Sequence, residues 1–400
     1  MPQSADVVVI GGGVIGLTVA RALALRGVHE VCLLERAALG TEASFAAGGI
    51  LAPQAEADGR DEFFELACRS RDLYFEFAAA LFEETGIDVE LDTTGTLYVA
   101  LWKRDVIEIE KRFEWQSKAG LAVEKLTARE ARELEPCIRE LTAWGSEGLR
   151  GALLFPRDVQ VENRRLLNAL VKSVDKLGVN IVTETNVESL TVQRGQSSGR
   201  DSHVSGVQTS RGFVSCKTVV VAAGTWSSTI KQTYPNNTTE THTSNVAPKI
   251  EPVRGQMICF DAQPQLTRHV IYSRRGYLVP RKDGRLIAGS TSEHAGFTKE
   301  VTAEGIAAIL AHVREISPQI DNLPIRETWA GLRPRAADGL PVLGPCDEID
   351  GLVYATGHYR NGILLAPVTG ELIAEAVVNG QVSPLLTAFS PNRFKLAHVS

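Results

Sequence analysis

Arg333 has the setting that most directly suggests chemistry. It follows the strand-like run 328–332 in the segment ETWAGLRPRAADGLPVLGP, and Pro334 comes directly after it. A residue before proline favours extended geometry, so we expect Arg333 to end a strand and to be held by a stiff turn. A guanidinium buried at such a place is costly unless it meets an anion. That anion is either an internal carboxylate, for which Asp338 is a candidate, or a ligand.

A glycine-rich turn near the start of the chain has the spacing of a phosphate-binding loop. Gly11, Gly13 and Gly16 fit GxGxxG between an apolar strand and a helix, and Glu35 follows at the end of the next strand. In this pattern the glycines permit the tight turn, the approach of a pyrophosphate and the packing of the helix on the sheet. The helix N-terminus presents N–H donors to the phosphates. The pattern predicts a dinucleotide site with Glu35 on ribose hydroxyls, and by itself it does not choose between FAD and NAD.

Two other stretches favour a flavin. The segment VVVAAGTWS carries an apolar strand into an Ala-Gly turn at Gly224, and GHYRNGILLAP at 357–367 follows another buried strand and opens towards a helix. Turns of this kind can present N–H groups to a flavin ring or ribityl chain.

The elements that must position these residues alternate between helix and strand. We expect strands over 6–10, 31–34, 96–101, 149–155, 218–223, 257–260, 276–280, 286–290 and 353–356. We expect helices over 17–26, 61–85, 103–120, 127–134 (with a capping box from Thr127 to Glu130), 163–177, 303–316 and 370–378. Residues 41–53 are expected to form a loop, and 234–245 a mobile insertion.

Composition and charge narrow the class of protein. With 400 residues, 44% of them hydrophobic, the chain is long enough for two domains. Its net charge of -6 argues against a nucleic-acid partner. The cysteines and histidines show no metal-ligand spacing, and we expect reduced, mostly buried thiols. The chain shows no signal peptide and no transmembrane run of about 20 apolar residues, so we expect a cytoplasmic protein.

Six segments together carry a family resemblance over nearly the whole chain. They are VVVIGGGVIG with Glu35, SFAAGGILAPQAE, RDEFFELACRSRDLY, GYLVPRKDGRLIAGST, TWAGLRPRAADGLPVLG and GHYRNGILLAP. With them the sequence resembles the D-amino-acid oxidase family of FAD-dependent oxidoreductases, and within it the glycine-oxidising members that serve thiamine biosynthesis. The last three segments are specific to that family, whereas the first is common to many flavoproteins.

The resemblance implies an α/β fold with two interleaved domains. One is a Rossmann-like FAD-binding domain of the glutathione-reductase type, assigned here to residues 1–55, 150–230 and 326–400. The other is a substrate-binding domain built on an antiparallel β-sheet, assigned to 56–149 and 231–325. The resemblance also implies a homo-oligomer.

The resemblance further implies which residues contact FAD. The expected set is Gly11, Gly13, Val14, Ile15, Gly16, Glu35, Arg36, Ala43, Ser44, Gly48, Gly49, Ile50, Val187, Gly224, His358, Tyr359, Arg360, Asn361, Gly362, Ile363 and Leu364. Members that tether their flavin use a His or Cys near the first glycine-rich loop or late in the chain. Residues 41–53 contain neither, so we expect non-covalent FAD. Cys346, which we expect in a surface-like turn, is a weak exception.

Three side chains are the expected substrate-binding and catalytic residues. The family resemblance assigns Arg333 to the substrate carboxylate, and a bidentate guanidinium contact suits that task. Tyr277 can donate its hydroxyl to the same carboxylate, and Arg360 can support it. The structural alternatives are an ion pair for each arginine, with Asp338 as the partner of Arg333, and a core position for Tyr277.

The sequence departs from the family pattern at two positions near this site. Arg275 stands two residues before Tyr277, where related sequences tend to carry histidine, and Ser292 stands where a bulky methionine can occur. We expect Arg275 to add positive charge near the pocket mouth and Ser292 to widen the pocket. Because of these two departures, the sequence does not identify the preferred amine substrate.

The activity implied is oxidative deamination of glycine, sarcosine and small D-amino acids. The products would be a 2-oxo acid, ammonia or an amine, and hydrogen peroxide, with molecular oxygen as acceptor, and the glycine imine would supply thiamine thiazole synthesis. Alternatives are a D-amino-acid dehydrogenase that uses another acceptor, a sarcosine oxidase-like enzyme, an FAD-binding assembly subunit without turnover, and a nicotinamide dehydrogenase.

Overall fold

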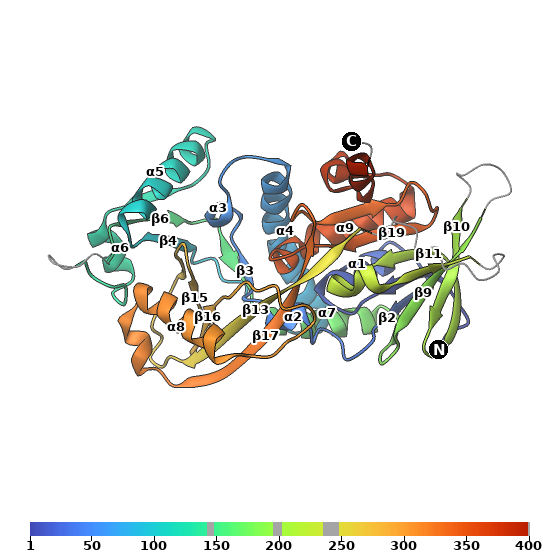
Figure 1. Cartoon of the computed structure of the whole chain (residues 1–400), viewed down its shortest axis with the longest axis horizontal. Helices are drawn as coiled ribbons and strands as arrows, with labels where there is room; N and C mark the ends of the chain where they lie inside the picture. The colour runs from blue at the N-terminus through green and yellow to red at the C-terminus, as the bar shows by residue number, and fades with distance from the viewer. Residues whose placement is uncertain (142–147, 195–201, 235–247, 399–400) are drawn as a thin grey trace.

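Two large sheets organise the chain into two lobes (Figure 1). The computed structural model describes residues 1–141, 148–194, 202–234 and 248–398. Nearly all of the insertion expected at 234–245 therefore lies outside the described residues.

The first sheet has nine strands and a parallel centre. Strand β1 lies between β11 and β2 with parallel pairing to both, β8 and β19 extend the parallel part on the two sides, and β18 pairs with β19. The remaining strands, β9, β10 and β12, continue the sheet from β11. The bounds are β1 Ser4–Ile10, β2 Val31–Leu34, β8 Asn180–Val182, β9 Val187–Gln193, β10 His203–Thr209, β11 Gly212–Val221, β12 Lys231–Thr233, β18 Val342–Pro345 and β19 Leu352–Thr356.

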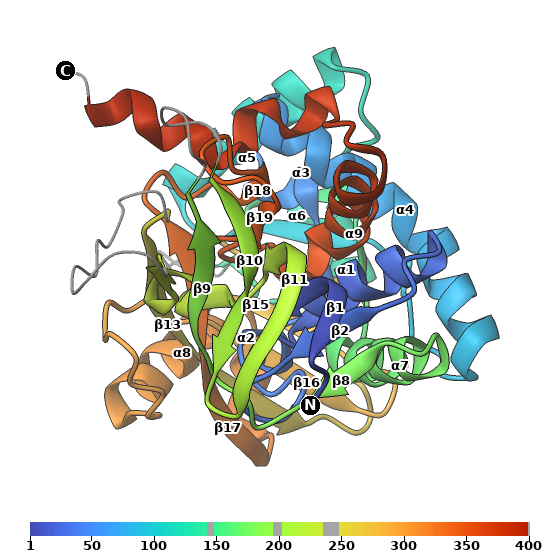
Figure 2. The same ribbon diagram turned by 90° about the vertical axis from the view of Figure 1, so that its right-hand side faces the viewer.

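Both faces of this sheet are covered, which explains why β1 is apolar over residues 7–10, whereas Ser4 and Asp6 before them are exposed. Val7 and Val9 pack in the cluster formed with the helices, whereas Val8 and Ile10 pack in the cluster formed with the β9–β10–β11 meander. A strand buried on both faces loses the usual alternation of apolar and polar residues. Figure 2 shows helices α1, α4, α7 and α9 gathered to one side of the meander. Their bounds are α1 Val14–Leu25, α4 Glu62–Thr85, α7 Asn163–Lys176 and α9 Gly362–Asn379.

The second sheet has eight strands and is antiparallel except where β14 pairs with β4. Its order is β17-β13-β16-β15-β14-β4-β6-β5, and helices α5, α6 and α8 lie in the same lobe (Figure 1). The bounds are β4 Thr96–Ala100, β5 Glu124–Leu126, β6 Gly151–Phe155, β13 Ile250–Asp261, β14 Val270–Tyr272, β15 Tyr277–Pro280, β16 Arg285–Gly289, β17 Ile325–Ala336, α5 Lys103–Lys118, α6 Ala128–Leu134 and α8 Ala303–Ile316.

The strands of the two sheets do not all follow the division of the chain expected from sequence. Strands β6 and β17 belong to the eight-stranded sheet, although the segments that begin at 150 and 326 are assigned from sequence to the FAD-binding domain. The division into two domains stays a proposal, and the long strands β13 and β17, which reach from one lobe towards the other in Figure 1, join the two lobes physically.

The segment expected to be a loop at 41–53 is more ordered than predicted. It forms the short helix α2 (Ala43–Ala46), the strand β3 (Ile50–Leu51, paired with β7, Val159–Gln160) and the start of the short helix α3 (Pro53–Glu56). The partners come from far along the chain: Asn163 Nδ2 donates to the carbonyls of Ser44 and Phe45, and Trp329 Nε1 donates to that of Ala46. The sequence of 41–53 alone does not reveal these partners, which is why a loop was expected there.

The last helix begins earlier than expected because other side chains satisfy the carbonyls that proline leaves unpaired. We expected helix over 370–378, but α9 starts at Gly362 and passes through Pro367. Proline lacks the N–H that would bond to the carbonyl of Ile363 four residues before it. The Tyr74 hydroxyl donates to that carbonyl instead, and Ser70 donates to the carbonyl of Leu364 at 2.6 Å.

Arg333 does not end its strand, contrary to the expectation from Pro334. Strand β17 runs on to Ala336, with Arg333 opposite Val253 and Pro334 opposite Pro252. An edge strand tolerates proline because its outer side needs no ladder hydrogen bonds. The Pro334 carbonyl accepts instead from the N–H of Tyr359 at 2.8 Å.

Several local predictions are confirmed. Thr127 and Glu130 form the expected capping box at the start of α6, and α8 spans the expected residues. No disulfide bond joins the six cysteines, and five of them are buried, as expected. Cys346 is one of the five, at 6% exposed, so its expected place in a surface-like turn is wrong. Among the described residues, one helix, α9, is long and apolar enough to cross a membrane by length and composition, and most of it is buried in this protein as a core helix.

Candidate active site

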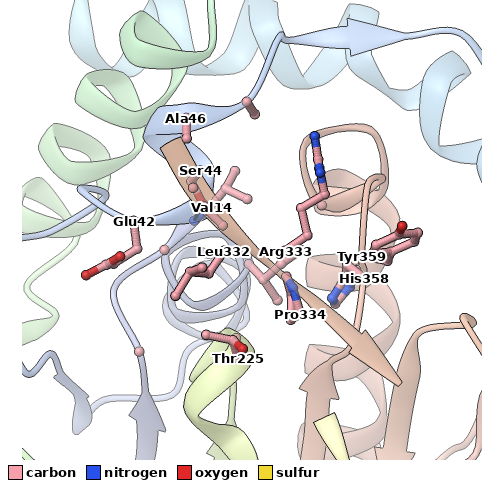
Figure 3. A pocket seen from close by; sticks show the side chains of 18 of the residues that line it. Val14, Glu42, Ser44, Ala46, Thr225, Leu332, Arg333, Pro334, His358 and Tyr359 are labelled. Atoms are coloured by element: carbon pink, nitrogen blue, oxygen red, sulfur yellow. Dashed lines mark hydrogen bonds between the residues drawn. The ribbon is translucent and has the colours of Figure 1, made fainter. Parts of the chain in front are cut away.

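A large cavity lies between the two sheets and is lined from both. Its empty volume, including the opening to solvent, is about 1670 Å³. One wall comes from the carboxyl ends of the parallel strands and the start of α1, and the other comes from β13, β15 and β17. Figure 3 shows Arg333, His358 and Tyr359 on one side of β17 and Glu42, Leu332 and Thr225 on the other. Open α/β sheets bind ligands at the carboxyl ends of their strands.

The glycine-rich loop leaves the start of α1 open to this cavity. Gly11 has φ +108°, and an added Cβ there would lie 2.4 Å from the Ala222 carbonyl oxygen. A Cβ on Gly16 would lie 1.8 Å from the carbonyl oxygen of Gly11, so this glycine permits helix packing and does not line the cavity. Gly13 caps α1 without a side-chain hydrogen bond, and the N–H of Val14 donates to Ser44 Oγ at 3.0 Å.

Glu35 and Arg36 stand at one end of the cavity. The Glu35 carboxylate accepts from the N–H groups of Gly12 at 2.7 Å and Ala37 at 2.9 Å, so it holds the glycine-rich loop in place. The Arg36 guanidinium lies 3.6 Å from the ring centroid of Trp226 and pairs with Glu42 at 2.7 Å. Sequence reasoning omitted Trp226 and Glu42 from the site, although Trp226 lies within the quoted VVVAAGTWS segment.

A buried arginine supports the segment around Gly48 and Gly49 from behind. Arg281 Nη2 donates to the Gly48 carbonyl at 2.8 Å, and Nη1 donates to that of Val161 at 3.0 Å. Burial lowers the pKa of Arg281 to about 10, so it remains charged at neutral pH. A Cβ on Gly49, whose φ is +68°, would lie 2.1 Å from the Val161 oxygen. Arg281 was missed, although it lies in the quoted segment GYLVPRKDGRLIAGST.

Arg333 lines the cavity without a carboxylate partner among the described residues. Its Nη1 donates to the Thr291 carbonyl at 3.0 Å and its Nη2 to Ser290 Oγ at 2.8 Å. Burial lowers its pKa, and the positive charge of Arg360 acts in the same direction. The ion pair with Asp338 is not formed, because Asp338 pairs with Arg393 at 2.7 Å. A Cβ on Gly255 would lie 2.2 Å from the Arg333 guanidinium, so this glycine makes room for it.

Tyr277 and Arg360 also line the cavity, in different settings. The Tyr277 hydroxyl lies 3.3 Å from Met257 Sδ, a weak partner, so it can turn to a stronger acceptor. Arg360 Nη2 is 3.3 Å from Glu56 Oε1, and this carboxylate raises the pKa of Arg360. The ion pair allowed for Arg360 from sequence is therefore present, with a partner that sequence reasoning did not identify.

His358 and Tyr359 follow β19 and begin the turn into α9. His358 is buried with Nε2 at 3.0 Å from Thr369 Oγ1, and burial lowers its pKa to about 3, so the ring is neutral. Tyr359 has φ +50°. All the other expected FAD residues line the cavity except Gly16, discussed above, and Leu364, which is 2% exposed in the core.

The two departures from the family pattern do not line the cavity. Arg275 forms an ion pair with Glu315, which contradicts the expectation of added charge at the pocket mouth. Ser292 is exposed and does not line the cavity, although its Oγ lies 3.5 Å from the hydroxyl of Tyr359, which does. In the parts of the chain with described structure, no group of three or more His, Cys, Asp or Glu residues could hold a metal ion.

Comparison with known proteins gives consistent matches over the whole chain. The family model described as FAD dependent oxidoreductase matches residues 6–376. Glycine oxidase of Geobacillus kaustophilus is 33% identical over 394 residues, which are 98% of each chain, and a crystal structure of glycine oxidase from this organism gives a TM-score of 0.87 at 31% identity, covering 98% of this chain and 99% of the other.

A second kind of relative is longer than this chain. The bifunctional protein ThiO/ThiG of Trichormus variabilis is 35% identical over 396 residues, which are 98% of this chain and 55% of the relative. The chain therefore spans about half the length of the bifunctional relatives that it matches.

Proposed function

The chain belongs to the FAD dependent oxidoreductase family, and from this premise we propose that it catalyses the oxidative deamination of glycine. Glycine, dioxygen and water would give glyoxylate, ammonia and hydrogen peroxide. The observation that carries the proposal is Arg333, a guanidinium that faces the cavity and has only neutral partners among the described residues. Family membership sets the nicotinamide alternative aside.

FAD is the cofactor of this family, and the cavity fits it. The open start of α1 and the absence of side chains at Gly11 and Gly13 suit the pyrophosphate, and Glu35 and Arg36, which line the same cavity, would contact the ribose and its surroundings. The lining includes the glycine-rich loop as well as Tyr277 and Arg333, so one cavity joins the residues expected to bind FAD to those expected to bind the substrate. FAD would supply the two-electron acceptor. The described lining contains no cysteine, and its His358 is buried against Thr369, which supports non-covalent binding.

Arg333 would bind the substrate carboxylate. Each Nη nitrogen donates one hydrogen to Ser290 or Thr291 and keeps a second, so the guanidinium is oriented and still has donors free. A fixed, partly desolvated cation binds a carboxylate more strongly than a solvated one does. Tyr277 would give a further hydroxyl contact, and the two together would fix the substrate Cα for reaction.

No side chain is assigned as a base in this proposal. Histidine is the usual candidate, and His358, the histidine that lines the cavity, is buried and bonded to Thr369. The amine would therefore bind deprotonated, which fits an optimum on the alkaline side of neutrality.

The further substrates, the electron acceptor, the oligomeric state, the metabolic role and the location are also part of the proposal. Sarcosine and small D-amino acids as further substrates, dioxygen as acceptor and a homo-oligomer rest on the resemblance to the family. A role in thiamine thiazole synthesis rests on that resemblance and on relatives named ThiO/ThiG. A cytoplasmic location is supported by cysteines that form no disulfide bond.

The test is to purify the protein, record its flavin spectrum and add glycine, sarcosine and D-alanine separately in air. Peroxide formed with glycine at least as fast as with D-alanine supports the proposal. Arg333→Ala should then lower kcat/KM at least about thirtyfold, because losing one partner of a buried charge pair costs roughly 2–5 kcal/mol. The control is Arg335→Ala, the next arginine on β17, which does not line the cavity.

The other outcomes separate the alternatives. Flavin bleaching without peroxide would favour a dehydrogenase with another electron acceptor. Faster turnover of sarcosine than of glycine would favour a sarcosine oxidase-like enzyme. No bleaching with any amine would leave an FAD-binding subunit without turnover.

A further inference from the structure

Arg333 and Arg360, two of the arginines that line the cavity, lie near enough for the charge of Arg360 to act on Arg333, and only one of the two is available to a ligand. Arg333 has neutral partners, as described above, whereas Arg360 is paired with Glu56. Glu56 Oε1 is 3.3 Å from Arg360 Nη2 and also accepts the Tyr272 hydroxyl at 2.8 Å. Side chains of Arg360 and Glu56 are 45% and 30% exposed, and both line the cavity, so a substrate can reach the pair.

The surroundings of Glu56 hold its carboxylate towards Arg360. Glu56 is the last residue of α3, whose Gln54 and Ala55 N–H groups donate to the buried carboxylate of Asp158 at 3.3 and 2.9 Å. Burial, followed by the charge of Glu56, raises the pKa of Tyr272 well above its usual value, so its hydroxyl keeps the proton that it donates. Glu56 is thus held at its backbone by the contacts of α3 with Asp158 and at its carboxylate by the Tyr272 hydroxyl.

Glu56 also acts on the charge seen at Arg333. The positive charge of Arg360 disfavours the charged form of Arg333, and the negative charge of Glu56 favours it. Because the charges of Arg360 and Glu56 oppose each other, Arg333 remains as the positive group without a carboxylate partner in this part of the cavity. One carboxylate matches that group. A second carboxylate on the same ligand would meet a cation that is already paired and an acid that repels it.

We propose that Glu56 is a specificity-determining residue: by pairing with Arg360 it keeps this arginine from binding a second carboxylate, and so restricts the site to amines with a single carboxylate. This inference rests on the proposed function for its substrate class. Specificity of this kind needs a repulsive element against the wrong ligand, and Glu56 supplies it.

The decisive variant is Glu56→Gln, which keeps the size of the side chain and its oxygen but removes the charge. The matched substrates are sarcosine and iminodiacetate, which differ by a second carboxylate on the N-methyl carbon. The rate of peroxide formation gives kcat/KM for each substrate. The assay is run at low ionic strength, because salt screens partly exposed charges. We expect the ratio of iminodiacetate to sarcosine to rise about tenfold or more in the variant. An unchanged ratio would overturn the proposal.

Two further variants show where the effect arises. Glu315→Gln removes the acid from Arg275, an equivalent pair outside the cavity, and should leave the ratio unchanged. The double variant Glu56→Gln/Arg360→Gln should lose the gain, because the freed guanidinium is gone. A gain that persists in the double variant, or appears in Glu315→Gln, would contradict the proposal.

Binding of non-reacting acids separates this inference from the proposed function. Calorimetry with malonate and acetate needs no turnover, and Glu56→Gln should tighten malonate about tenfold while acetate changes little. If no amine is oxidised but malonate binds more tightly, the proposed function fails and the charge selection by Glu56 stands. If Glu56→Gln does not fold, Arg360→Gln tests the same idea with the opposite sign: the unpaired Glu56 should weaken malonate further, and unchanged binding would overturn the proposal.

Discussion

At the scale of single residues, the site depends on space and charge around a few side chains. Arg333 can extend into the cavity because the strand opposite carries Gly255 and no side chain at that level. Its two hydrogen bonds orient the guanidinium without neutralising it. Arg281, by contrast, uses its donors on backbone carbonyls and acts as a support behind Gly48.

Gly255→Ala should weaken substrate binding without unfolding the protein. The new Cβ would lie 2.2 Å from the Arg333 guanidinium, which must move. We expect KM for glycine to rise about tenfold or more, as for a lost charge-assisted contact of roughly 1.5–3 kcal/mol. Gly59→Ala is the control, since a Cβ there meets nothing within 4 Å. Equal KM values in the two variants would show that the guanidinium does not need this space.

His358 should make stability depend on pH on the acid side. Its folded pKa of about 3 lies below the ordinary value of 6.5, so the unfolded chain binds more protons between these values. Stability from this residue is therefore present above pH 6.5 and is lost as the pH falls towards 3. His358→Gln should flatten the fall in unfolding free energy measured by denaturant titration across this window. The same slope in both proteins would contradict the prediction.

At the scale of elements, α9 shows how one helix depends on another. Pro367 leaves the Ile363 carbonyl without its helical donor, and Tyr74 and Ser70 of α4 donate to the carbonyls of Ile363 and Leu364. Ile363 lines the cavity at the start of α9. The packing of α4 on α9 therefore also shapes the site.

Tyr74→Phe should destabilise the protein by about 1–3 kcal/mol, because it leaves a buried carbonyl unpaired. The loss should be smaller in a Pro367→Ala background, where residue 367 regains an N–H for Ile363. Denaturant unfolding of the unchanged protein, the two single variants and the double variant gives the coupling free energy between positions 74 and 367. Additive losses would show that Tyr74 stabilises α9 in some other way.

At the scale of the whole molecule, the cavity couples the two sheets. Its walls come from the parallel strand ends of one sheet and from β13, β15 and β17 of the other. A ligand that fills it contacts both lobes and binds only the folded chain.

Removal of FAD should therefore lower the thermal unfolding midpoint of the whole chain. A ligand present at about 100 times its Kd stabilises the folded state by roughly 2.7 kcal/mol, and dialysis to the FAD-free form removes this. Scanning calorimetry of the FAD-loaded and FAD-free protein measures the shift, and added FAD should restore it. A midpoint that does not move would mean that FAD is not bound in this cavity.

The sequence by itself determined the features that depend on neighbours along the chain. The strand, glycine turn, helix and acid from β1 to Glu35 appear as predicted, because glycine conformation and helix starts are fixed by local spacing. The capping box at Thr127 is local in the same way. The family resemblance added Arg333 and Tyr277 to the site, and both line the cavity.

Only the tertiary structure decided which distant residues meet. Glu56 and Arg360 are 304 positions apart, and Arg281 and Gly48 are 233 apart, so no local pattern joins them. The early start of α9 and the continuation of β17 through Pro334 likewise depend on Tyr74 and Tyr359. Buried polar groups must find partners, and packing of the whole chain determines which partners are within reach.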